Sequence, residues 1–171
     1  MTEGRTVRVD PHVHTAASYD GHSPPEDLLD AADRAGLDAV VVTDHDTVAG
    51  ARAAEALASE YGVAVIRGCE VSTADGHLLA IGGTDQPDPD RPLPAPAPEA
   101  PARGGVAGGP PPFPRPRPRG SAASSPPRDG IEVHNAHTVS NIRNGQAREF
   151  AACHGYATYG GSDAHRPRTV G

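Results

Sequence analysis

Two histidines separated by one residue, His12 and His14, stand at the end of an extended stretch near the start of the chain. Side chains along a strand repeat every two residues, so both imidazoles point the same way and could hold one metal ion together. Asp163 and His165 repeat this alternate spacing near the other end of the chain. One such pair is a weak signal, because surface and structural histidines share the pattern, and the second pair strengthens it.

Further side chains suited to metal binding lie at or near the edges of predicted strands. They are Asp20, His45, Glu70 and His77. Imidazoles and carboxylates without cysteine suit borderline to hard divalent ions such as Zn²⁺, Mn²⁺ or Fe²⁺. Because four ligands complete a tetrahedral site, this many candidates predicts two or three ions.

Strands and helices that alternate along the chain would position these residues. Strands are predicted over 6–10, 38–43, 63–66, 77–81, 130–135 and 156–159, from their β-branched and apolar patterns. Helices are predicted to begin at Ser23 (with Pro24 in the first turn and a capping box to Glu26), Thr47 and Ser140, and to end at Gly36, Gly62 and Gly155.

This alternation predicts an α/β fold with a parallel sheet or barrel whose chemistry lies at the carboxyl ends of the strands. Six of the candidate residues fall at such ends. They are His12, His14, His45, Glu70, Asp163 and His165.

The composition sets limits on the class of protein. A chain of 171 residues is the size of one domain, 1–171, and has no apolar run long enough to span a membrane. Cys69 and Cys153 are too far apart to suggest a disulfide framework, and together with the absence of a signal peptide they predict a cytoplasmic protein. A formal charge of −7 disfavours stable binding to duplex DNA.

The segment 86–130 differs from the rest because it holds most of the 19 prolines. Each proline removes a backbone donor and clashes with the preceding helical turn, so this segment cannot be helical. It is predicted to be a degenerate, irregular insertion with polyproline II structure or disorder.

Read in order, these motifs resemble those of the PHP (polymerase and histidinol phosphatase) domain family, in its small stand-alone metal-dependent phosphoesterase form. They are His12 with His14, Asp20-Gly21, Thr43 to Asp46, Gly68 with Glu70, His77-Leu78-Leu79, and Gly161 to His165. The resemblance runs from about residue 6 to the end and fails in the proline-rich segment.

The resemblance implies a distorted seven-stranded (β/α) barrel around a cluster of up to three divalent ions. It assigns His12, His14, Glu70 and Asp163 to a first ion, Glu70 and His77 to a second, and Asp20, His45 and His165 to a third. The catalytic roles would fall to Asp20, His45 and Glu70. The implied reaction is hydrolysis of a phosphate ester by a metal-bound hydroxide.

One family position departs from the expected pattern. Pro111 stands where the family has a ligand histidine, and a proline ring offers no lone pair to a metal. His134 and His137 are candidate substitutes, although a strand-end or loop role is simpler for both. Either the chain is a divergent enzyme with fewer ions, or codons 86–130 carry a compensated reading-frame error. The end at Gly171 would suit a fragment.

Two functions from different classes remain open. The leading hypothesis is a metal-dependent phosphoesterase that acts on a small phosphorylated substrate, such as a nucleotide or a short RNA or DNA end. The alternative is a catalytically impaired PHP-like binding or regulatory module. A proofreading nuclease attached to a polymerase is disfavoured because no polymerase segments accompany the motifs. No membrane partner is expected, and the sequence does not define an oligomeric state.

Overall fold

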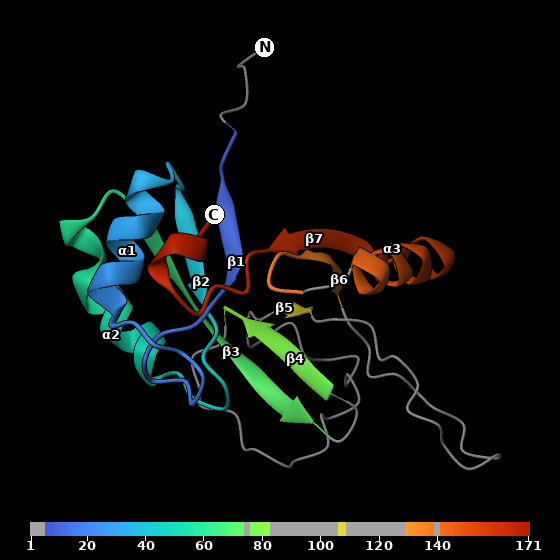
Figure 1. Ribbon diagram of the computed structural model, residues 1–171, viewed down its shortest axis with the longest axis horizontal. Coiled ribbons are helices and arrows are strands. Elements are labelled where there is room, and N and C mark those ends of the chain that lie inside the picture. Colours follow the sequence, from blue (N-terminus) through green and yellow to red (C-terminus); the bar gives the residue numbers. More distant parts are fainter. Residues whose placement is uncertain (1–5, 74–75, 83–105, 109–128, 139–140) are drawn as a thin grey trace.

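The computed structural model describes residues 6–73, 76–82, 106–108, 129–138 and 141–171 (Figure 1). Its strands are β1 (Val9–Val13), β2 (Ala39–Val42), β3 (Ala64–Thr73), β4 (Gly76–Ile81), β5 (Val106–Gly108), β6 (Gly130–Asn135) and β7 (Ala157–Gly161). Its helices are α1 (Pro25–Arg34), α2 (Ala49–Leu57) and α3 (Asn141–His154), with 3-10 turns η1 (Ala58–Glu60) and η3 (Pro167–Thr169). Within these ranges no helix is long and apolar enough to cross a membrane.

The described strands form two hydrogen-bonded sheets. β1, β2 and β3 are parallel neighbours, and β3, β4 and β5 continue the same sheet in antiparallel fashion. β6 and β7 pair in parallel as a second sheet. The result is a mixed α/β fold with a curled half-barrel sheet, and α1 and α2 lie together beside β1 and β2 (Figure 1).

This topology differs from the expectation in two respects. The sheet is not parallel throughout, because β4 returns antiparallel to β3 directly after it. A continuous seven-stranded barrel is not confirmed either, since the described strands divide into a five-stranded and a two-stranded sheet. The α/β class itself is confirmed.

The larger core lies between the parallel strands and the helices α1 and α2. Its buried members are Val13, Leu29, Ala32, Leu37, Val40, Val42, Ala51, Ala54, Val63 and Ala164. Val13 alternates with His12 and His14, so β1 turns its valine to this core and leaves the two imidazoles on the opposite side. A smaller core of Ile131, Ala147 and Ala151 joins β6 to α3.

Several element boundaries differ from the predicted ones. β1 begins later than expected and contains His12. β3 is longer than expected and contains Glu70, which therefore lies inside the strand rather than at its carboxyl end. His77 is the second residue of β4. The predicted strand over 130–135 coincides with β6.

The helix ends also test the capping predictions. The first helix has Pro24 at its N-cap and no side-chain capping bond, so the predicted capping box from Ser23 is wrong. Gly36 has a φ of 69° and follows the helix end, as predicted for a glycine that stops a helix. Thr47 Oγ1 accepts a hydrogen bond from Ala49 N at the start of α2. Ser140 lies outside the described residues.

Most of the proline-rich segment 86–130 also lies outside the described residues, including Pro111. Within the segment the structure describes Val106–Gly108, which forms β5 and pairs with β4. Two further residues of the segment are described: Asp129 precedes β6, and Gly130 is its first residue.

Candidate metal centre

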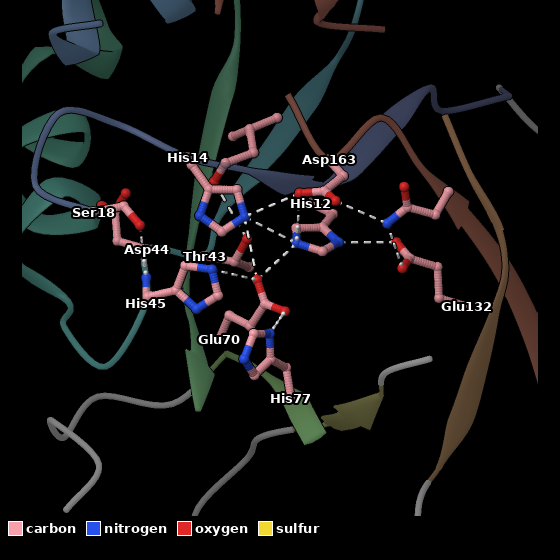
Figure 2. Close-up of polar contacts among 12 residues, drawn as sticks. His12, His14, Ser18, Thr43, Asp44, His45, Glu70, His77, Glu132 and Asp163 are labelled. Carbon is pink, nitrogen blue, oxygen red and sulfur yellow. Dashed lines mark hydrogen bonds and ion pairs between the residues drawn. The ribbon is translucent and has the colours of Figure 1, made fainter. Parts of the chain in front are cut away.

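The eight side chains singled out in the sequence converge on one place, although they come from both ends of the chain and from its middle. Figure 2 labels His12, His14, His45, Glu70, His77 and Asp163 of this set. Three overlapping groups have potential ligand atoms within 4.8 Å of one another. The groups are His12, His14, Glu70 and Asp163; His14, Asp20 and His165; and His45, Glu70 and His77.

The first group has the spacing of a tetrahedral site. Nε2 of His12 lies 3.0 Å from Nε2 of His14, 3.1 Å from Glu70 Oε2 and 3.3 Å from Asp163 Oδ1. Nε2 of His14 lies 3.2 Å from each of the same two oxygens. Ligands placed about 2.0–2.1 Å from a tetrahedral centre are roughly 3.3 Å apart. The donor types and their separations therefore fit a divalent cation.

Glu70 lies at the centre of the cluster and is buried. Its Oε1 accepts a hydrogen bond from His77 Nδ1 at 2.9 Å, while its Oε2 faces His12 and His14 (Figure 2). The preceding residue, Cys69, points to the other side of β3 and packs in a small core, as the strand period predicts. Burial raises the pKa of the Cys69 thiol to about 12, so it is an inert core residue.

The second region of the cluster is built around Asp20, in the loop after β1. Its Oδ2 lies 3.2 Å from His45 Nε2 and 3.1 Å from His165 Nε2. Nε2 of His45 lies 3.5 Å from Glu70 Oε2, so this imidazole stands between the Asp20 and Glu70 carboxylates. Asp20 is partly exposed, which leaves this side of the cluster open to a ligand from solvent.

Short loop contacts fix the positions of these side chains. Ser18 Oγ donates to Asp20 Oδ1 and accepts from His45 N. The Asp44 carboxylate accepts hydrogen bonds from Thr15 N and Thr15 Oγ1. Asp44 therefore does not orient the His45 ring, whose Nδ1 is buried without a hydrogen-bond partner.

The turn that carries the candidate ligands Asp163 and His165 is held against β1 by hydrogen bonds. His14 N donates to Ala164 O at 2.8 Å, and buried Asp10 accepts from Ser162 N at 3.0 Å. Asp163 has a φ of 53°, the left-handed conformation that aspartate tolerates better than most residues. This turn places Asp163 opposite His12 although they are far apart in sequence.

Opposed effects set the protonation of the first group. Burial disfavours the charged form of His14, but its hydrogen bonds with Asp163 and Glu70 outweigh burial and raise its pKa to about 9. Burial also opposes charge on His12, and hydrogen bonds to Glu132 and Glu70 raise its pKa well above the ordinary value. Without a metal, these imidazoles therefore retain protons that a cation would have to displace.

Burial and hydrogen bonds also set the pKa values of the other charged groups in the cluster. Burial alone would raise the pKa of Glu70, but hydrogen bonds with His12, His14 and His77 hold it far below its usual range. Hydrogen bonds likewise keep the pKa of Asp163 low against the effect of burial. Burial lowers the pKa of His45, so this ring is neutral near pH 7. The cluster thus combines ionised carboxylates with nitrogen donors.

Two residues around the cluster were missed by sequence reasoning. Glu132 in β6 is buried, with Oε1 3.0 Å from His12 Nδ1. Asn135 donates from Nδ2 to Glu132 Oε2 and to Asp163 Oδ2. The polar residues that alternate with Ile131 and Val133 were the available signal, but alternation does not say which face of a strand will be covered.

His134 and His137, the candidate substitutes for a histidine at the Pro111 position, lie at the margin of the cluster. His137 is exposed, and its ring is tilted against His165 with centroids 4.8 Å apart. His134 is exposed and lines a separate cavity of about 330 Å³ together with Asp10 and Gly160. Neither belongs to the three ligand groups found among the described residues.

Comparison with known families identifies this arrangement. The family model described as "PHP domain" matches residues 10–144, and the model described as "PHP-associated" matches residues 141–171. The chain belongs to the PHP domain family. The matched range contains six of the eight converging residues, and the PHP-associated range contains Asp163 and His165.

This PHP chain is similar in sequence to short parts of longer proteins. It is 49% identical over 63 residues to an error-prone DNA polymerase of Nocardia farcinica, covering 36% of this chain and 5% of the polymerase. It is 41% identical over 68 residues to a 5'-3' exoribonuclease of Haemophilus influenzae, covering 40% of this chain and 24% of that protein. The chain therefore spans only a small part of these relatives.

A solved structure shares the fold over nearly the whole chain. It is a two-domain protein from Bacteroides vulgatus that contains a predicted PHP-like metal-dependent phosphoesterase. The TM-score is 0.73 at 24% identity, covering 95% of this chain and 53% of the other. The likeness supports the PHP fold and carries no assignment of substrate.

Proposed function

We propose that this PHP chain is a metal-dependent phosphoesterase that hydrolyses a phosphate ester of a small phosphorylated substrate, a nucleotide or an oligonucleotide end. The observation that carries the proposal is the close approach of His12 Nε2 and His14 Nε2 to Glu70 Oε2 and Asp163 Oδ1, at 3.0–3.3 Å. These separations are close to those expected between ligands that surround one tetrahedral cation.

The proposed ligands divide into three overlapping sets. His12, His14, Glu70 and Asp163 would hold a first ion, and Glu70 with His77 a second. Asp20, His45 and His165 would hold a third, with His14 beside them because its ring stacks on His165 with centroids 4.4 Å apart. Mn²⁺, Zn²⁺ and Fe²⁺ all suit this set of nitrogen and oxygen donors.

Divalent ions bound here would neutralise phosphoryl oxygens and make a water more acidic. The chain's own residues would do the rest. Neutral His45 presents Nε2 to the ionised Asp20 carboxylate, 3.2 Å away at the partly exposed side of the cluster. Glu70 keeps its negative charge over the whole physiological pH range because its pKa is lowered. Asp20, His45 and Glu70 are therefore the proposed catalytic residues.

An exposed aromatic ring beside the cluster supports a nucleotide as substrate. Tyr19 is 77% exposed and stacks on His45, with ring centroids 4.6 Å apart. Its outer face is available to a base or another planar group, and stacking of this kind tolerates any base. That one relative is named an exoribonuclease agrees with a substrate of this class.

The arrangement of the strands is consistent with the distorted barrel of the family. β7 lies beside β1, and β5 lies beside β6, so the two sheets meet along both edges. We infer that the strands surround the cluster in the order β1 to β7, with interrupted hydrogen bonding where the sheets meet.

The test is release of inorganic phosphate from a panel of nucleotides and 5'-phosphorylated oligonucleotides with added Mn²⁺. The expected result is turnover that depends on Mn²⁺ and is lost in His12→Ala but retained in His154→Ala, an exposed histidine on α3. Turnover by the wild-type chain no greater than that of His12→Ala on every substrate would remove the proposal.

A second candidate function is a catalytically impaired PHP module that binds a partner or ligand. It is favoured by Pro111, where the family has a ligand histidine. Counting metal separates the two functions: two or more ions held tightly per chain supports the enzyme, and none supports the impaired module.

A further inference from the structure

A buried carboxylate stands behind the first ligand group, on the far side of His12. The Glu132 side chain is 0% exposed and comes from β6, in the two-stranded sheet. Its Oε1 lies 3.0 Å from His12 Nδ1, the ring nitrogen that faces away from the cluster. Burying a carboxylate is costly unless it is hydrogen-bonded, so this placement has to be supported by specific partners.

The partners of the second Glu132 oxygen lead back to the cluster. Asn135 Nδ2 donates to Glu132 Oε2 at 3.2 Å and to Asp163 Oδ2 at 3.0 Å. The Asn135 backbone is fixed in turn by buried Asn144, which accepts from Asn135 N and donates to Asn135 O. A continuous set of hydrogen bonds therefore runs from α3 to two of the four proposed ligands.

We propose that Glu132 and Asn135 are a positioning pair for the metal centre, and this inference rests on the proposed function. A neutral imidazole carries one proton. If His12 donates that proton from Nδ1 to Glu132, the lone pair of Nε2 faces the cluster, as a metal ligand requires. Asn135 occupies Oδ2 of Asp163 and leaves Oδ1 to face His12 and His14.

The surrounding backbone is adapted to this contact. A Cβ on Gly161 would lie 2.6 Å from Glu132 Oε1 and 2.7 Å from His12 Cβ. Any larger residue at position 161 would therefore displace Glu132 or His12. By contrast, Nδ1 of His14 and Nδ1 of His45 are buried without a hydrogen-bond partner. Among the described buried imidazoles of the cluster, His12 is therefore the one that a carboxylate outside the ligand set holds in place.

The experiment compares the affinity for Mn²⁺ and for Zn²⁺, by competition with a chromophoric chelator, in the wild type and in Glu132→Gln. A glutamine amide can accept from His12 or from Asn135 but presents an N–H to the other, so one of the two bonds is lost. The expected loss of affinity is about 10- to 100-fold. The matched control is Glu149→Gln, an exposed glutamate on α3, which should bind both ions like the wild type.

A second variant guards against a merely structural effect. Asn135→Ala should also lower the metal affinity, and the double variant should lose less than the two single losses combined, because both act through one set of hydrogen bonds. Metal-free melting temperatures, measured in excess chelator, identify a variant that fails to fold. If Glu132→Gln does not fold, Asn135→Ala decides the question.

The outcomes separate this inference from the proposed function. Metal affinities of both variants within twofold of the wild type would overturn the positioning role, whatever the activity. If the wild type binds metal and Glu132→Gln binds it more weakly, the positioning role is supported. If the same wild type releases no phosphate from any substrate, the proposed function is overturned. Partial recovery of phosphate release in Glu132→Gln at high Mn²⁺ is the activity signature expected of a positioning residue.

Discussion

The metal-free protein should become less stable as the pH rises from 6.5 to 9. The reason is His14, whose pKa in the folded chain is about 9 against an ordinary value of 6.5. A group whose folded pKa is raised stabilises the fold fully below its unfolded pKa, and that stabilisation is lost as the pH rises through the folded pKa. The pKa values of His12 and His77 are also raised, so they act in the same direction.

The size of the effect follows from His14 alone. The interval between 6.5 and about 9 corresponds to roughly 3 kcal/mol in the free energy of unfolding, at about 1.36 kcal/mol for each pKa unit. For a chain of this length, that change lowers the melting temperature by about 6–12 °C. The lowered pKa of His45 contributes only below pH 6.5 and does not oppose the trend.

The assay is thermal unfolding in excess chelator across this pH range, repeated with Mn²⁺. With the metal the slope should reverse, because the cation competes with protons for the same nitrogens and binds more tightly as the pH rises. His14→Gln should flatten the metal-free slope, while His154→Gln, at an exposed position, should leave it unchanged. A metal-free melting temperature that is constant or rises between pH 6.5 and 9 would refute the reasoning.

Three further predictions address the centre, the substrate and the core. Glu70→Gln removes the charge shared by four imidazoles and should lower Mn²⁺-dependent phosphate release by at least about 100-fold, measured at saturating substrate. Tyr19→Ala should lower kcat/KM for a nucleotide by about 5- to 150-fold while Tyr19→Phe and the rate on ribose 5-phosphate change little, and equal losses on both substrates would exclude base stacking. Leu29→Ala, at 1% exposure in the larger core, should cost about 2–5 kcal/mol in urea unfolding, and a cost below about 1 kcal/mol would contradict the packing described.

The shared direction of His12 and His14 could be expected from the sequence because it depends only on the local geometry of a strand. Alternate spacing in a strand placed His12 and His14 on one side, and their Nε2 atoms lie 3.0 Å apart. The same spacing predicted that Cys69 would turn away from Glu70, and it packs in a core. The metal-binding roles themselves stay predictions until metal is measured.

The direction of β4 was less accessible, because sheet pairing depends on partners outside the local sequence. A signal was present nonetheless. Thr73 in β3 pairs with Gly76 in β4, and so short a connection allows only an antiparallel return, since a parallel crossover needs a dozen or more residues. The predicted strand ended at Ile66, whereas β3 continues to Thr73, and this difference hid the connection.

The role of Glu132 could not be assigned from its strand. Its position between Ile131 and Val133 marks one face of β6 as polar, and a polar face is most often solvated. The face is buried only because β6 lies against the site, and that contact depends on the tertiary arrangement of the two sheets. Glu132 is therefore a buried partner of His12 because of long-range packing, although its sequence position is typical of a surface residue.

The most direct test of the central claim is the metal content of the full-length, sequence-verified chain, measured by elemental analysis after equilibration with Mn²⁺ or Zn²⁺ and removal of unbound ions. We expect two or more ions per chain in the wild type and loss of at least one ion in Asp163→Ala. A wild-type chain that retains less than one ion, or an Asp163→Ala variant with unchanged content, would contradict it.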